Sequence, residues 1–239
     1  KANTYFEKYL NFNTKSEVVK YNLGLNYYKQ RNFNKAQDQF DKLVSENENY
    51  RDSELFLGII QSELNDFDNA ITSFQNLIDK NIYLAESFFN LGIVYQKKNQ
   101  FKSSINYFKK AIEKNNQHFQ FFNSLGISYQ KLFDYENAED AYKKSINLND
   151  KNSNAFSNLG FLKQKNGNFK EATKNFDSAL QINPNDPKIL YNKSICLLES
   201  GNFEEGLKFY KWRQNGRYSK NILFDLKNIK NKKILVTCD

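Results

Sequence analysis

The 239-residue sequence contains few of the residues on which metal sites, disulfide frameworks and histidine-based catalysis depend. It has two cysteines, one histidine, two prolines and no methionine. Two cysteines cannot build a disulfide framework, and His118 alone supplies neither a typical zinc site nor a catalytic triad. Cys196 lies in an apolar stretch, which predicts a small packed core residue. We therefore expect no metal site, no cofactor and no catalytic residue in this segment, and a reducing, cytoplasmic location.

Long apolar runs are also absent. The longest run, residues 55–60, includes one glycine and is far shorter than the roughly 20 residues that span a bilayer. The sequence has no glycine-rich phosphate loop, no His-Glu-x-x-His and no Gly-x-Ser-x-Gly motif. We expect neither a membrane partner nor catalysis by this segment. Whether a longer parent protein is an enzyme stays open on this basis.

The net charge of +8 is concentrated at one end of the chain. Residues 208–239 contain nine basic and two acidic residues, whereas the other 207 residues contain 26 basic and 25 acidic ones. A nucleic-acid interface needs a basic stripe along the body of the fold, because its affinity comes from neutralising many phosphates. The body is nearly neutral, so we expect no nucleic-acid partner.

A 34-residue interval dominates the sequence. Small residues recur at this spacing, at Gly24, Gly58, Gly92, Gly126, Gly160 and Ser194. With Glu17 as position one, the six units are residues 17–50, 51–84, 85–118, 119–152, 153–186 and 187–220. Position seventeen is always aromatic, at Phe33, Phe67, Phe101, Tyr135, Phe169 and Phe203. Position twenty-four is aromatic as well, at Phe40, Phe74, Phe108, Tyr142, Phe176 and Tyr210. Such a period indicates a repeat fold.

These columns resemble the tetratricopeptide repeat, a helix-turn-helix unit with small residues at positions eight and twenty and aromatic residues at seventeen and twenty-four. The resemblance covers residues 17–220 and implies an all-α fold, a right-handed superhelical solenoid of antiparallel helix pairs. We expect Asp186 to cap a helix that begins at Pro187. Residues 1–16 are predicted to form the second helix of a truncated preceding repeat, or an unrelated N-terminal capping helix.

In this family the first helix of each unit lines the concave face, which implies a peptide-binding groove. The predicted groove residues are Asn22, Asn90, Asn158, Asn192, Gln96, Gln130, Gln164, Lys97, Lys131 and Lys165. A row of amides can grip an extended peptide backbone, because each amide both donates and accepts hydrogen bonds. The row resembles the asparagine ladder of the O-GlcNAc transferase repeats, although Phe56 and Ser124 interrupt it. The alternative is a solvated face, since 36 of the 239 residues are asparagine.

One family subtype is excluded by position nine. Repeats that clamp the carboxyl terminus of heat-shock chaperones have lysine at position five and asparagine at position nine. The ninth positions here are all apolar, at Leu25, Ile59, Ile93, Ile127, Phe161 and Ile195. The sequence therefore predicts a scaffold whose groove binds an extended segment of a protein partner without a carboxylate clamp. Homo-oligomerisation through the concave face or the end repeats is a weaker alternative.

The carboxyl-terminal end indicates a second hypothesis. Residues 201–206 read Gly-Asn-Phe-Glu-Glu-Gly, and Tyr-x-Trp-Arg follows at residues 210–213. This resembles bacterial proteins whose solenoid passes into a glycosyltransferase-like domain. Residues 221–239 are then a basic linker and the start of a truncated α/β domain, with a short apolar strand at 232–237. On this hypothesis the repeats recognise the acceptor of a larger glycosyltransferase.

Overall fold

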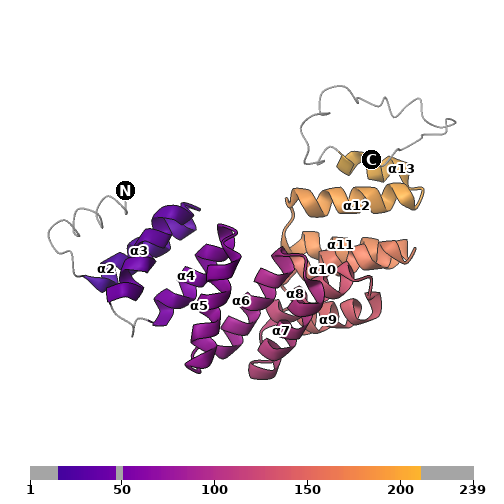
Figure 1. The fold of residues 1–239 in the computed structure, drawn as a ribbon. Coiled ribbons are helices and arrows are strands. Elements are labelled where there is room, and N and C mark those ends of the chain that lie inside the picture. The colour runs from indigo at the N-terminus through magenta and orange to yellow at the C-terminus, as the bar shows by residue number, and fades with distance from the viewer. Residues whose placement is uncertain (1–15, 47–50, 211–239) are drawn as a thin grey trace. The chain divides into compact units, whose positions relative to one another are not determined.

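The computed structural model describes residues 16–46 and 51–210 (Figure 1). The predicted helix before Ser16 lies outside the described residues, and so do the predicted linker and strand after residue 220 and the Tyr-x-Trp-Arg motif beyond Tyr210. The predictions for these segments stay predictions.

The described residues form twelve α-helices and no strand. The first helices of the pairs are α2 (Glu17–Lys29), α4 (Arg51–Glu63), α6 (Leu84–Lys97), α8 (Phe119–Lys131), α10 (Ser153–Lys165) and α12 (Pro187–Glu199). The second helices are α3 (Phe33–Glu46), α5 (Phe67–Asp79), α7 (Phe101–Lys114), α9 (Tyr135–Leu148), α11 (Phe169–Ile182) and α13 (Phe203–Tyr210). The expected all-α helical repeat is thereby confirmed, and each second helix begins at the aromatic residue of position seventeen.

The helices fall into two compact units, which divide after Leu148. Unit one contains α2–α9 and unit two contains α10–α13, and each unit is described by itself. Within a unit, each helix packs against the one before and the one after it in the chain (Figure 1). No helix in the described part of the chain is long and apolar enough to cross a membrane.

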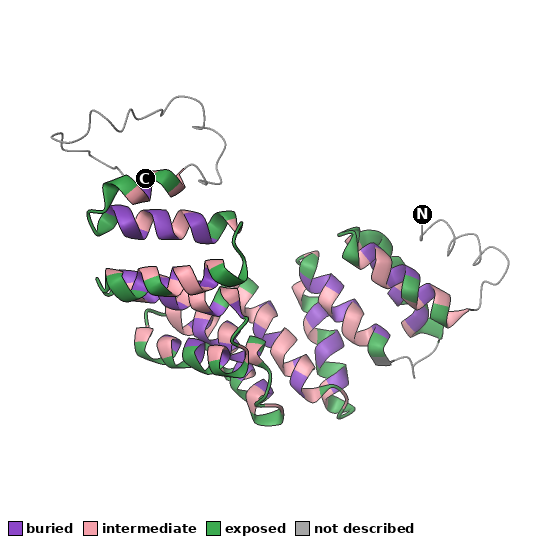
Figure 2. Ribbon diagram, turned by 180° about the vertical axis from the view of Figure 1, so that it is seen from behind, coloured by how far each residue is buried: buried purple, intermediate pink, exposed green. Residues whose placement is uncertain are grey.

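The glycine column explains how two helices of a pair approach each other. In pair three, a Cβ atom at Gly92 would lie 2.5 Å from the ring of Phe108, which is fully buried. The same contact joins Gly24 to Phe40, where the distance would be 2.8 Å. Real Cβ atoms do not approach rings this closely, so only glycine allows the ring to lie against the backbone of the facing helix. Buried residues accordingly occupy the helix faces that meet neighbouring helices (Figure 2).

The start of α12 follows the capping chemistry that the sequence predicts. The side chain of Asp186 accepts hydrogen bonds from the backbone N–H groups of Lys188 and Ile189, at 2.9 and 3.2 Å. Pro187 is the first helical residue of α12, where a missing N–H costs nothing. Asn168 caps α11 in the same way, because its side chain accepts from the N–H of Glu171. The prediction for Asp186 and Pro187 is confirmed.

Candidate functional site

The first helices of successive pairs contact each other directly within each unit. Helix α4 contacts α6 and α6 contacts α8 in unit one, and α10 contacts α12 in unit two. Side chains at one repeat position therefore lie on neighbouring helices of the same layer. This layer is the surface on which the sequence predicts the peptide groove.

At position six, Asn22 and Asn90 use only part of their hydrogen-bonding capacity within the described residues. The side-chain NH₂ of Asn22 donates to the carbonyl of Val18, and that of Asn90 donates to Glu86, both at 2.9 Å. Each side-chain carbonyl and second N–H is left for another partner. Asn22 is exposed and Asn90 is half-buried, so both can be reached from solvent. Asn158 and Asn192 are half-buried on the first helices of unit two.

The position-twelve glutamines hold helices together. Gln96 donates to the Ser128 hydroxyl at 2.9 Å and to the Ser124 carbonyl at 3.3 Å, which ties α6 to α8. Gln130 accepts at 2.7 Å from the hydroxyl of Tyr142, whose pKa is raised by burial. A ligand that reached these amides would compete with the internal bonds.

The side chain of Gln164 likewise bonds to a neighbouring helix, in unit two. Its amide is buried and donates to a carboxylate oxygen of Glu199 at 2.7 Å, which joins α10 to α12. The sequence pattern does not indicate this bond, because an amide in a helical surface pattern can face either solvent or the next helix. Of the predicted groove amides, Asn22 and Asn90 are therefore more available to a ligand than the three glutamines.

The three predicted groove lysines have different environments. Lys97 donates to the carbonyl of Ser62 at 2.9 Å and to a carboxylate oxygen of Glu63 at 2.8 Å, so its charge is largely balanced. The ammonium group of Lys165 lies 5.3 Å from the centroid of the Phe161 ring. Lys131 is exposed and makes no ion pair with any described residue. It is the predicted groove lysine whose positive charge is most available to a ligand.

An apolar row at position nine accompanies these polar groups. Leu25, Ile59, Ile93 and Ile127 are half-buried on the first helices of unit one. The inner atoms of Leu25, Ile59 and Ile93 pack against the core, while the remainder of each side chain faces solvent. Position nine lies three residues after position six, so each aliphatic side chain is on the same helix face as the residue at position six. From the sequence alone, position nine only excludes a carboxylate clamp. In the structure, the position-nine row also adds an apolar surface to the face that carries the position-six residues.

The residues that most often perform chemistry have ordinary structural environments. Cys196 is buried, its sulfur lies 3.7 Å from the Thr173 hydroxyl, and burial raises the pKa of its thiol, which disfavours the thiolate. His118 is exposed at the start of α8, and its ring stacks on Phe121 at 4.8 Å. Within residues 16–46 and 51–210, no group of three or more His, Cys, Asp or Glu side chains could hold a metal ion.

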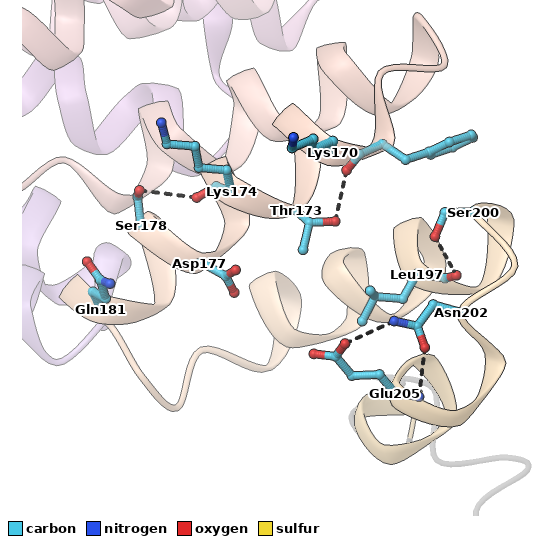
Figure 3. Close-up of a pocket in the computed structure, with 11 residues that line it drawn as sticks. Lys170, Thr173, Lys174, Asp177, Ser178, Gln181, Leu197, Ser200, Asn202 and Glu205 are labelled. Carbon is cyan, nitrogen blue, oxygen red and sulfur yellow. Dashed lines mark hydrogen bonds between the residues drawn. The ribbon is translucent and has the colours of Figure 1, made fainter.

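A groove of about 570 Å³ lies in unit two between α11 and the α12–α13 turn (Figure 3). Three of its hydroxyl and amide groups are already bonded close to their own positions in the chain. Thr173 donates to the carbonyl of Phe169 at 2.9 Å, and Ser200 donates to that of Leu197 at 2.8 Å. The Asn202 amide donates to a Glu205 carboxylate oxygen at 3.1 Å. No set of reactive groups converges there, so this groove supports no catalytic assignment.

Solved structures of low sequence identity have the same fold. TTC0263, a thermophilic tetratricopeptide repeat protein of Thermus thermophilus, is 20% identical with a TM-score of 0.65, and the match covers 77% of this chain and 100% of that chain. PilF of Pseudomonas aeruginosa is 14% identical with a TM-score of 0.70, over 82% of this chain and 89% of that chain. YrrB, a tetratricopeptide repeat protein with an unusual peptide-binding site, is 21% identical with a TM-score of 0.56, over 72% and 89%. No curated protein matches the sequence.

The family assignment comes from sequence models of the repeat itself. Four models of the tetratricopeptide repeat match the chain, at residues 21–83, 85–118, 119–152 and 163–211. These ranges cover well over half of the sequence, and the helices recur with the same 34-residue period. The chain therefore belongs to the tetratricopeptide repeat family.

Proposed function

We propose that this protein is an interaction scaffold whose first-helix surface in unit one binds an extended segment of a protein partner. The observation that carries the proposal is the surface formed by α2, α4, α6 and α8. This surface combines half-exposed aliphatic side chains at position nine with the available amides of Asn22 and Asn90 and the free charge of Lys131. Tetratricopeptide repeats are typically scaffolds rather than enzymes, and YrrB has a peptide-binding site.

The chemistry of this surface defines the ligand. Asparagine side chains recognise backbone N–H and C=O groups, so they select an extended strand without selecting its side chains. The half-exposed Leu25, Ile59, Ile93 and Ile127 favour apolar side chains in that strand. Lys131 favours an acidic residue near the α8 end of the surface. We therefore propose an extended, partly apolar peptide with an acidic residue.

The test starts from a phage-displayed library of random peptides selected against the protein. The best peptide is labelled, and its affinity is measured by fluorescence polarisation for the protein and its variants. We expect Asn90→Ala to weaken binding by about tenfold, since a lost hydrogen bond costs about 1 kcal/mol or slightly more. Asn158→Ala in the same assay tests whether unit two takes part.

The matched control is Asn175→Ala on the second helix α11. Asn175 also donates its side-chain NH₂ to the carbonyl four residues earlier, that of Glu171 at 2.8 Å, but it lies outside the first-helix layer. The control should bind the peptide like the parent protein. Failure to select any peptide, or equal affinities for Asn90→Ala and Asn175→Ala, would refute the proposal. The glycosyltransferase hypothesis depends on residues 211–239, which lie outside the described ranges, together with residues 201–206, and it stays a prediction.

A further inference from the structure

The turns that join the two helices of each pair share one backbone conformation. At position fifteen the residue is left-handed in every pair, with φ between 57° and 83°, at Arg31, Asn65, Asn99, Phe133, Gly167 and Gly201. The backbone bonds around it are also the same. In pair four the N–H of Phe133 donates to Gln130 at 3.1 Å, and the N–H of Asp134 donates to Tyr129 at 3.0 Å. This is the Schellman arrangement, which normally has glycine or asparagine at the left-handed residue.

Phe133 does not suit this position. Its Cβ and ring are disfavoured at positive φ, and for a bulky residue such a conformation is a genuine outlier. Burial does not compensate, because Phe133 is 78% exposed, the largest exposed fraction among the described large hydrophobic residues. Leu132 beside it is 37% exposed. Because burial of the ring does not offset the backbone strain at Phe133, we look for a binding role for this residue.

The ring is held in place at the surface. Tyr135, at the start of α9, packs edge-on against Phe133, with ring centroids 6.2 Å apart and planes at 76°. An aromatic ring that projects from a rigid turn and is fixed by a neighbour loses little entropy on binding. Such rings are typical anchors of protein interfaces. Phe133, Leu132 and Tyr135 form what we call the Phe133 knob.

Charge decides which partner fits the Phe133 knob. Lys131 precedes it and Glu136 follows it, and both are exposed without an ion pair to any described residue. Asp134 lies between them in the chain, and its carboxylate accepts a hydrogen bond from the side-chain NH₂ of Asn137 at 2.8 Å. A two-fold axis exchanges the two sides of a surface, so it brings the lysine of one copy to the glutamate of the other. The charges around the ring are therefore self-complementary.

We propose that the Phe133 knob mediates association of two copies of this chain about a two-fold axis. Phe133 of one copy packs on Phe133 of the other, and Lys131 of each copy pairs with Glu136 of the other. The apolar patch is smaller than that of a standard interface, which buries roughly 1,200–2,000 Å², so we expect weak association with a Kd on the order of 0.1 mM. This role goes beyond the proposed function, since Phe133 and Leu132 lie in a turn outside the first-helix layer. Only Lys131, the last residue of α8, is shared with the proposed peptide surface.

The test is sedimentation equilibrium of the full chain from about 10 µM to about 500 µM, a range that brackets the expected Kd. The average mass of the parent protein should rise toward that of a dimer, whereas Phe133→Asn should stay monomeric. Asparagine suits the left-handed turn, as at Asn65 and Asn99, so the variant should melt about 2–4 °C higher. Loss of association with gain of stability separates a binding role from a folding role.

Arg31→Asn is the matched control, because Arg31 occupies the same left-handed position of pair one. It should also melt higher but associate like the parent. A charge swap tests the geometry: Glu136→Lys should weaken association at least fivefold, and adding Lys131→Glu should restore it. A parent protein that stays monomeric at the highest concentration would overturn the proposal. So would association of Phe133→Asn with unchanged affinity, since that result would place the interface elsewhere on the chain.

Discussion

Pairs three and six solve the same packing problem in opposite ways. In pair three the close approach is on the first helix, where Gly92 receives the ring of Phe108. In pair six the glycine is on the second helix: a Cβ at Gly206 would lie 2.8 Å from a methyl carbon of Leu198 and 3.1 Å from its backbone nitrogen. The helices of a pair need one glycine where they approach most closely, and either helix can supply it.

Position seven separates the same two pairs. In pair three it is Leu91, which is fully buried. In pair six it is Lys193, which is only 7% exposed. Its ammonium group lies 2.8 Å from Asp177 and 3.5 Å from Glu205, and 4.8 Å from the ring centroid of Phe209. A repeat position that is apolar elsewhere can thus hold a buried charge when both neighbouring second helices provide carboxylates.

The largest expected difference in the free energy of unfolding comes from removing the side chain that packs against the glycine of each pair. Phe108→Ala should lower the free energy of unfolding by about 3–5 kcal/mol, because it leaves a ring-sized cavity in the core. Leu198→Ala in pair six should lower it by about 2–3 kcal/mol, since a smaller side chain is lost. Urea unfolding followed by circular dichroism measures both. Equal losses would mean that the pairs do not differ in how they use the glycine.

Two substitutions at position eight should change stability in opposite directions: a larger residue at Gly92 in pair three, and a smaller one at Ser194 in pair six. Gly92→Ala gains helix propensity but places a methyl group against Phe108, so we expect a net loss of about 1–2 kcal/mol. Ser194 is fully buried and its hydroxyl has no partner within the described residues. Ser194→Ala removes that unsatisfied group and should stabilise the protein by up to about 1 kcal/mol. Thermal melts of the two variants check the signs, and shifts in the same direction would contradict this explanation.

The fold was predictable because the start of the second helix recurs six times at one repeat position. Position seventeen alone marks the first residue of every second helix, from Phe33 to Phe203. The place of the glycine was not predictable in pair six, because Ser194 continues the small column while the close approach moves to Gly206. A repeat position in the sequence shows which residue types are tolerated there. Which of the two helices carries the glycine at their closest approach depends on contacts that only the structure shows.

The candidate site was predictable only in part. The family pattern places Asn90 and Gln96 on the same helix, and both are amides with the same hydrogen-bonding groups. The structure directs Gln96 toward Ser128 on α8, whereas Asn90 bonds only to its own helix. That difference depends on side-chain length and on the distance to the next first helix, which the sequence does not contain. Phe133 was missed for another reason, since its significance lies in a backbone angle.

The smallest expected effect concerns the buried lysine of pair six. Lys193→Leu restores the apolar residue of position seven, and we expect the free energy of unfolding to change by less than about 1 kcal/mol. The ion pair with Asp177 offsets the cost of burying the ammonium group, so removing both terms leaves little net change. Urea unfolding of this variant measures the effect. Lys208→Gln, which removes the exposed ion pair with Glu204, serves for comparison.

A double-mutant cycle then shows what Lys193 contributes. Asp177→Asn in the parent protein should cost about 1 kcal/mol, because the ammonium loses its closest carboxylate and keeps only Glu205. In the Lys193→Leu background the same change should cost nothing. If Asp177→Asn were equally costly in both backgrounds, the lysine would not be coupled to this carboxylate. Coupling together with a neutral Lys193→Leu would mean that the charge specifies how α12 meets α11 and α13 without adding stability to the repeat.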